Sequence, residues 1–312
     1  MALAMAARVL VGTCSWTDKT LLESGWYPPE ARTPEDRLRY YARHFPIVEV
    51  DSSYYALPSP RNSLLWAQRT PDGFVFDVKA FALFTHHPTP PRSLPKDLLE
   101  ELPVELRQKR NLYYRDLPSE LTDELWRRFA QSLSPLALAG KLGVVLLQFP
   151  PWFQPGRDSR QYIASLSERL PGLEVAVEFR QARWLAEERD RRQTLSFLRE
   201  HGLPLVCVDE PQGFASSVPP LAEVTAPLAL VRFHGRNSAT WEAKGLTTAE
   251  RFNYLYTPEE LEEWVPRIGR MAQEAEEVHV LFNNCYRDYA VRNARQMAQA
   301  LGRAPEQRGP LL

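Results

Sequence analysis

A short apolar run that ends in polar or charged residues occurs eight times along this chain of 312 residues. The runs cover residues 9–16, 48–55, 74–81, 143–150, 174–180, 205–210, 228–236 and 278–284. Helical segments separate most of them, so the sequence predicts strand–helix units with parallel strands. Eight such units predict an α/β fold of the (β/α)₈ type, a closed barrel of strands covered by helices. Active sites of such barrels lie at the C-terminal ends of the strands.

Helix signals fall between the predicted strands. Three helices begin with a Ser or Thr cap followed by proline: Thr33-Pro34, Ser59-Pro60 and Thr257-Pro258. Two further helices are predicted over residues 187–201 and 289–301, each followed by glycine. Residues 211–227 show no helical period, so the sixth helix is expected to be short or absent.

A long segment interrupts the pattern between the third and fourth strands. Residues 84–142 are rich in proline at first and then charged and helical, which predicts an insertion above or beside the barrel mouth. His86 and His87 open this segment and are expected to be solvated. We expect one barrel domain over residues 1–312 that includes this insertion.

The charges of the chain nearly cancel, with 38 Lys and Arg residues against 39 Asp and Glu residues. A chain without a basic excess has no general attraction for nucleic acid or for an anionic membrane, so any anion site must be local. No apolar run approaches the roughly 20 residues of a membrane helix, and residues 1–7 lack the features of a signal peptide. We therefore expect a cytoplasmic protein with neither a membrane nor a nucleic-acid partner.

Alternation along each strand predicts which side chains point into the barrel. The outward face packs against helices and must be apolar, so the polar residues between apolar ones face inward. This rule turns Glu178 and Arg180 of the fifth strand inward, and it places Arg232, His234 and Arg236 of the seventh inside or at the rim. Polar residues of the first four strands are expected inside by the same rule: Thr13, Ser15, Glu49, Asp51, Ser53, Asp77, Lys79 and Gln148.

Ionic side chains from five strands are thus expected to share one small volume at the mouth of the barrel. They are Asp51, Lys79, Glu178, Arg180, Asp209, Arg232, His234 and Arg236. Buried charges must pair, be hydrated or bind a ligand. Glu49 and Asp77 lie deeper and are expected to be structural salt-bridge partners. Aliphatic layers alone can fill the interior of a barrel, so the fold does not require this many buried charges. We therefore do not expect the whole set to be purely structural.

The excess of guanidinium groups at the mouth predicts a small anionic ligand, because their planar fork fits phosphate and carboxylate. The predicted substrate-binding residues are Arg180, Arg232, Arg236, Asn283, Asn284, Gln148, Asp51, Ser15, Trp16 and Tyr55. Aromatic side chains at such positions are more often part of the core. Glu178 near Lys79 or His234 supplies an acid and a base, so these three are the predicted catalytic residues.

Two other classes of function remain open. A metal-dependent phosphodiester hydrolase acting on nucleic acid would use Glu178, Asp209 and His234 as ligands. However, no HxH or HExxH spacing occurs, and the nearby arginines would repel a cation. A non-catalytic ligand-binding or partner-binding barrel is the third possibility. We prefer a metal-independent enzyme, and no cofactor is predicted.

Several motifs resemble one family in order along the chain. They are GTCSW at 12–16, VEVDSSYYAL at 48–57, TPDGFVFDVK at 70–79, LLQFPP at 146–151, VEFR at 177–180, VRFHGRN at 231–237 and FNN at 282–284. Together they resemble the DUF72 (YecE-like) family, whose members are (β/α)₈ barrels without an assigned function. The resemblance implies the barrel fold and places its motifs on the strand ends, but it names no reaction. The chain departs from the commonest family pattern at Cys14-Ser15-Trp16, which replaces Ser-Gly-Trp, and in the long segment after the third strand.

Overall fold

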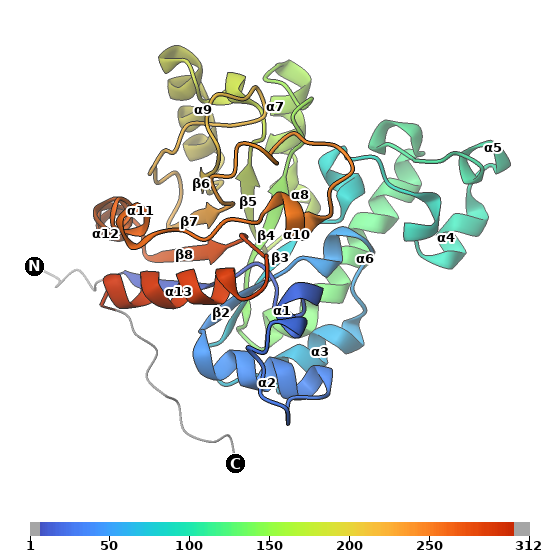
Figure 1. Ribbon diagram of the computed structural model, residues 1–312. Helices are drawn as coiled ribbons and strands as arrows, with labels where there is room; N and C mark the ends of the chain where they lie inside the picture. The colour runs from blue at the N-terminus through green and yellow to red at the C-terminus, as the bar shows by residue number, and fades with distance from the viewer. Residues whose placement is uncertain (1–6, 303–312) are drawn as a thin grey trace, which may run out of the picture.

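Eight parallel strands form a nearly closed barrel in the computed structural model, which describes residues 7–302 (Figure 1). The strands are β1 Arg8–Thr13, β2 Ile47–Val50, β3 Val75–Lys79, β4 Leu142–Gln148, β5 Glu174–Glu178, β6 Val206–Asp209, β7 Leu228–Phe233 and β8 Glu277–Phe282. Their order in the sheet is β5-β4-β3-β2-β1-β8-β7-β6. β5 and β6, the two ends of this order, meet through a bridge between Val177 and Leu205. The eight predicted strands are thereby confirmed.

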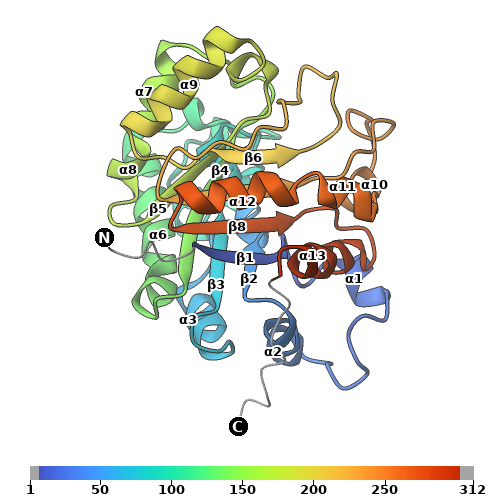
Figure 2. The same ribbon diagram turned by 90° about the vertical axis from the view of Figure 1, so that its left-hand side faces the viewer.

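Helices cover the outside of the barrel, as two perpendicular views show (Figures 1 and 2). The α-helices are α1 Lys19–Glu23, α2 Pro34–His44, α3 Pro60–Gln68, α4 Lys96–Glu101, α5 Val104–Arg107, α6 Ser119–Leu138, α7 Arg157–Ala164, α8 Leu166–Arg169, α9 Glu188–Glu200, α10 Thr248–Arg251, α11 Pro258–Glu262, α12 Val265–Glu274 and α13 Tyr289–Ala300. Short 3₁₀ helices are η1 Ser52–Tyr54, η2 Ala82–Thr85, η3 Pro91–Ser93, η4 Tyr114–Asp116 and η5 Ala182–Trp184.

The predicted helix starts are confirmed by their capping bonds. The hydroxyls of Thr33, Ser59 and Thr257 each accept a hydrogen bond from a backbone N–H in the first turn of α2, α3 and α11. These bonds satisfy donors that the helix itself leaves free. No helix forms in residues 211–227, also as expected.

The buried apolar residues form two clusters. The larger cluster includes the residues packed between the strands and the helices. A smaller cluster inside the barrel consists of Leu10, Cys14, Ile47, Val75 and Leu281. Buried polar residues also lie inside the barrel, where His279, the β8 residue paired with Leu10, contacts Asp77 at 2.9 Å and Glu277 at 2.7 Å.

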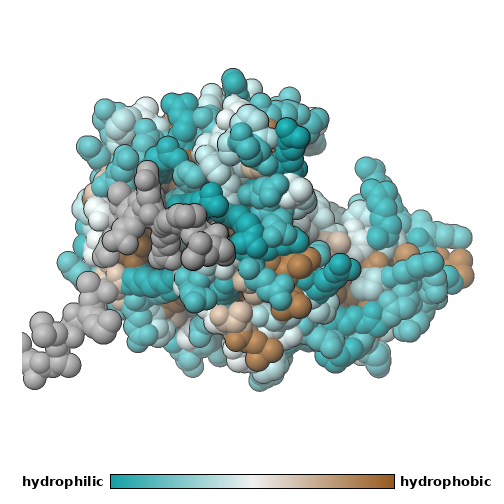
Figure 3. All heavy atoms as spheres, turned by 90° about the horizontal axis from the view of Figure 1, so that it is seen from below, coloured by the Kyte–Doolittle hydropathy of each residue, from teal (hydrophilic) through white to brown (hydrophobic). Residues whose placement is uncertain are grey.

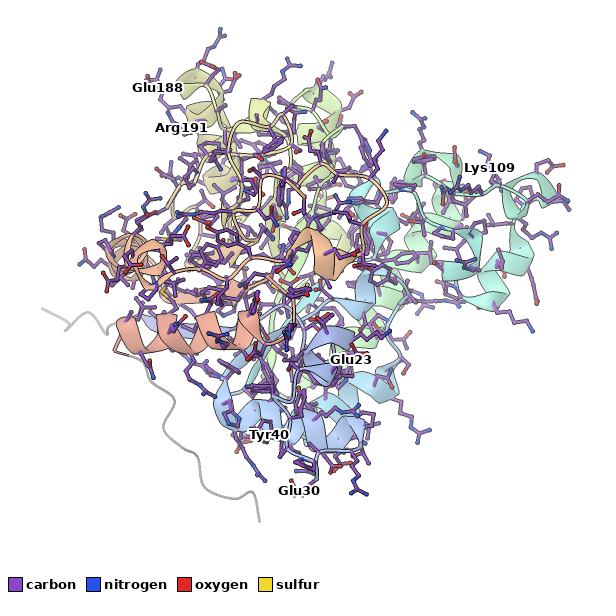
Figure 4. All side chains as sticks on the ribbon, viewed as in Figure 1. Glu23, Glu30, Tyr40, Lys109, Glu188 and Arg191 are labelled. Atoms are coloured by element: carbon purple, nitrogen blue, oxygen red, sulfur yellow. The ribbon has the colours of Figure 1, made fainter. Side chains whose placement is uncertain are left out.

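The segment between β3 and β4 forms a lobe beside the barrel. α6 packs against α3 and β4 as a barrel-covering helix, whereas α4 and α5 project sideways (Figure 1). Seen from below, the lobe and the adjoining barrel face are mostly hydrophilic, with hydrophobic residues in separate places (Figure 3). Charged side chains such as Lys109 of the lobe and Glu188 of α9 extend outward (Figure 4). Within residues 7–302 no helix is both long enough and apolar enough to cross a membrane.

Candidate functional site

Five buried side chains form a line of alternating acid and base across the upper barrel. Arg232 donates from Nη2 to Glu49 Oε1 at 2.6 Å and from Nη1 to Glu178 Oε2 at 2.5 Å. Arg180 continues the line, with its Nε donating to Glu178 Oε1 at 2.7 Å and its Nη1 to Glu210 Oε2. We call Glu49, Arg232, Glu178, Arg180 and Glu210 the charge ladder.

Strand register explains why these side chains meet. Paired residues of neighbouring parallel strands point to the same side of the sheet, and Gln148 pairs with Glu178. Arg232 pairs with Leu281, a member of the cluster inside the barrel, so Arg232 also points inward. The alternation rule is confirmed for Glu178 and Arg232.

Burial and neighbouring charges separate the carboxyl groups of the ladder. Burial alone would raise the pKa of Glu178, but the guanidiniums of Arg232 and Arg180 outweigh it and hold that pKa well below its usual range. Burial raises the pKa of Glu49 to about 8 against the opposing effect of Arg232. Burial likewise raises the pKa of Glu210 to about 8, against Arg180. Glu178 is therefore the permanent anion at the centre of the ladder.

His234 joins the ladder as a neutral imidazole. Burial and the charge of Arg180 hold its pKa well below the usual range. Its Nε2 lies 3.0 Å from Arg180 Nη2 and 3.2 Å from Glu178 Oε1. Its Nδ1 lies 2.9 Å from Asn283 Nδ2. His234 and Asn283 thus hold Arg180 from one side.

The three predicted catalytic residues occupy different depths. Glu178 is 0% exposed, and both of its carboxylate oxygens are occupied by guanidinium groups. His234 is equally buried, whereas Lys79 retains 15% exposure of its side chain. Of the three, Lys79 is therefore the residue that solvent reaches most readily.

Lys79 and Asp51 form a second, more open pair at the mouth. Lys79 Nζ lies 3.4 Å from Asp51 Oδ1 and 4.9 Å from the centroid of the Tyr54 ring. His87 packs between the rings of Tyr54 and Trp152, at 5.3 and 5.8 Å. It is partly buried, contrary to the expectation of a solvated loop residue, and burial lowers its pKa to about 3.

A cleft of about 570 Å³ opens beside the charge ladder. Its lining includes Gln148, Trp152, Arg180, Trp241, Lys244, Arg251 and Phe252. Arg180 is 7% exposed, and its guanidinium lies 5.0 Å from the centroid of Trp241. The ladder therefore presents one edge, Arg180, to the cleft.

The structure places Arg236 and Asp209 outside this site. Asp209 pairs with Phe233 across the strands and so faces the helices, where it accepts hydrogen bonds from Tyr256 Oη and Trp264 Nε1, both at 2.7 Å. Arg236 donates to the same carboxylate at 2.8 and 2.9 Å. The expectation that both residues face the barrel interior was wrong, because this polar cluster satisfies them in the outer layer.

Other predicted binding residues also lie elsewhere. Asn284 donates to the Tyr254 carbonyl and to the side chain of Asn293 of α13, away from the barrel interior. Trp16 packs against Trp66 and Phe76 in the outer core.

The first strand also differs from expectation. Thr13 does not face inward, because its hydroxyl and that of Tyr41 in α2 lie 2.9 Å apart. Ser15 lies after β1 in a strained conformation at φ 130° and lines a small separate cavity. Tyr55 is 63% exposed and is not among the residues that line the cleft.

Sequence reasoning missed Glu210, Cys14 and the aromatic wall of the cleft. Cys14, the residue after Thr13, is the side chain that faces inward, with its Sγ 3.5 Å from Glu49 Oε2. Glu210 follows Asp209 directly. The run from Leu205 to Val208 is apolar on both faces, so alternation had no polar partner with which to set the register.

Metal binding has no ready ligand set in the described part of the chain. Among residues 7–302 no group of three or more His, Cys, Asp and Glu side chains is placed to hold a metal ion. Of the three residues expected as ligands in a phosphodiester hydrolase, Asp209 faces away from the other two, Glu178 and His234.

These features define a class of protein: a nearly closed, eight-stranded α/β barrel with an ionic cluster and a cleft at the C-terminal end of its strands. The family model described as "Protein of unknown function DUF72" matches residues 10–311. The chain belongs to the DUF72 family.

Relatives of known sequence and structure match over nearly the full chain. The UPF0759 protein YunF of Bacillus subtilis (strain 168) is 32% identical over 308 residues, which cover 96% of this chain and 98% of YunF. The UPF0759 protein YecE of Escherichia coli (strain K12) is 25% identical over 285 residues, covering 83% and 89%. A crystal structure of a DUF72 family protein from Thermotoga maritima MSB8 has a TM-score of 0.73 and 32% identity, covering 95% of this chain and 99% of that one. Another, from Enterococcus faecalis V583, has a TM-score of 0.78 and 28% identity, covering 97% and 99%.

Proposed function

We propose that this protein is an enzyme that binds a small anionic metabolite, phosphorylated or carboxylated, in the cleft beside the charge ladder. The observation that carries the proposal is the charge of the cleft lining. Arg180, Lys244 and Arg251 contribute three cations, against one acid, Glu242.

The cations of the rim are available to a ligand. Among residues 7–302 no carboxylate forms a salt bridge with Lys244 or Arg251. Arg251 instead donates to the backbone carbonyls of Trp241 and Ala243 at 3.2 and 3.1 Å, which orients its guanidinium without neutralising it. Arg251 is partly buried, which strengthens its attraction for an anion, whereas Lys244 is exposed.

We assign proton transfer to Lys79, with Asp51 as its partner. Lys79 does not line the cleft itself, but it is the predicted catalytic residue with a partly exposed side chain, and Tyr54 and His87 connect it to Trp152 of the cleft. Glu178, Arg232 and His234 act as positioning residues, because they hold Arg180 and do not touch the ligand. A barrel that binds the same anion without turnover is the second candidate, favoured by the complete pairing of the ladder.

The test of binding is a thermal-shift series with inorganic phosphate, phosphosugars and carboxylates. A ligand at 100 times its dissociation constant stabilises the folded state by about 2.7 kcal/mol. Arg251→Gln should abolish the shift, whereas Arg61→Gln, an exposed arginine on α3, should leave it unchanged. If no anion stabilises the wild-type protein, or if both variants respond like the wild type, the cleft is not an anion site.

The test of catalysis uses any ligand that passes the first assay. Lys79→Met should abolish turnover and retain binding within a few-fold. Retention of turnover in this variant would remove Lys79 from the chemistry, and the absence of turnover in the wild-type protein would favour the binding barrel.

A further inference from the structure

The aromatic residues of the cleft point to a ligand with a flat ring. Trp152 is 56% exposed although it follows β4 directly and its neighbours Phe149 and Phe153 are buried and stacked at 4.0 Å. The Trp152 Nε1–H donates to the His86 carbonyl oxygen at 3.4 Å, which holds the ring at the edge of the cleft. Trp152 lines the cleft with its ring edge against His87.

A second aromatic wall lies on the other side of the cleft. Phe252 follows α10, in the connection after β7, and its ring lies 6.3 Å from Trp241 and 6.0 Å from His234. Trp152 and Phe252 therefore come from connections that are separated in the barrel by β5 and β6. Arg180, at the end of β5, lies between these connections and contributes to the same cleft.

The polar groups around these rings match the other parts of a nucleotide. Lys244 and Arg251 suit a phosphate group. Glu242, which accepts a hydrogen bond from Ser216 Oγ at 2.6 Å, retains acceptor capacity of the kind that binds ribose hydroxyls. A cleft of about 570 Å³ lies within the range of pockets that enclose a ligand of this size.

We propose that the anionic ligand of this cleft is a nucleoside monophosphate whose base stacks on Trp152, with its phosphate at Lys244 and Arg251. The inference rests on the proposed function and adds a requirement for the ring. Stacking of a base on an aromatic side chain is sequence-tolerant, so purine and pyrimidine nucleotides are both suitable probes.

The experiment compares dissociation constants for AMP, UMP, ribose 5-phosphate and adenosine by isothermal titration calorimetry. AMP or UMP should bind at least fivefold more tightly than ribose 5-phosphate, as expected for one stacked base. Trp152→Ala should remove this preference and leave the affinity for ribose 5-phosphate unchanged. Tyr55→Ala is the matched control, because Tyr55 is 63% exposed, against 56% for Trp152, but does not line the cleft. Lys244→Ala should weaken all three phosphates, while the exposed Lys96→Ala should not.

The possible failures are distinguishable. If ribose 5-phosphate binds as tightly as both nucleotides, the ring is not recognised, and the proposed anion site stands without it. If adenosine binds as tightly as AMP, the cleft recognises the ring without the anion, which overturns the nucleotide assignment. If none of the phosphates binds, both proposals fall. Thermal unfolding of each variant shows that a change in affinity is not a loss of fold.

Discussion

Replacing Glu178 by glutamine tests whether the charge ladder is a framework or a catalytic device. Both Glu178 oxygens accept from guanidinium groups, at 2.5 and 2.7 Å. A glutamine must present an NH₂ group to one of these donors, and it leaves Arg180 and Arg232 without their shared anion. Breaking a fully buried ion pair by removing one partner costs about 3–5 kcal/mol, so we expect the free energy of unfolding to fall by that amount.

The assay is equilibrium unfolding in urea at pH 7, followed by circular dichroism. Glu242→Gln, at the exposed rim of the cleft, is the control and should change the free energy of unfolding by less than about 0.5 kcal/mol. A double variant, Glu178→Met with Arg232→Met, should lose less than the sum of the two single changes, because the bond between these two residues is then lost only once. A loss below about 1 kcal/mol in Glu178→Gln, together with abolished turnover, would refute the framework role and make Glu178 catalytic.

Three further predictions concern the barrel itself. Protonated His279 donates to Asp77 and Glu277 at 2.9 and 2.7 Å, and these carboxylates outweigh burial and raise the pKa of His279 to about 9. We expect the charged imidazole to add up to about 3 kcal/mol to the free energy of unfolding. This stabilisation is complete below pH 6.5 and is lost as the pH rises through 9. An NMR titration that finds this imidazole neutral at pH 7.5 would contradict the assignment. Ser15→Gly should raise the free energy of unfolding by about 1 kcal/mol, because Ser15 is strained at φ 130°, and an unchanged urea midpoint would show that the strain is absent. Gly12→Ala should lower it by about 1–3 kcal/mol, since a Cβ there would overlap the Ile47 carbonyl oxygen; a stability equal to that of the wild type would show that the strands can separate at this point.

Strand alternation predicted the interior where polar and apolar residues alternate clearly. β5 and β7 each carry isolated charges between aliphatic residues, and Glu178 and Arg232 were placed correctly for that reason. On β1 the alternation rule predicted that Thr13 points inward. In the structure Thr13 points outward, where its hydroxyl forms a hydrogen bond with that of Tyr41. Both faces of β6 are apolar, so the sequence did not show whether Asp209 or Glu210 points into the barrel. In the structure, contacts with residues far away in the sequence decide this. The cleft walls come from connections after β4 and β7, whose proximity no local pattern encodes.

The meeting of β5 and β6 has a consequence for how ligand and fold communicate. Backbone pairing there is limited to a single bridge, and the bond from Arg180 to Glu210 crosses the same seam between the ends of these strands. A side-chain ion pair thus supplements the limited main-chain pairing between these two strands. If an anion bound in the proposed site competes with Glu210 for the guanidinium, we expect it to weaken this contact between the two ends of the sheet.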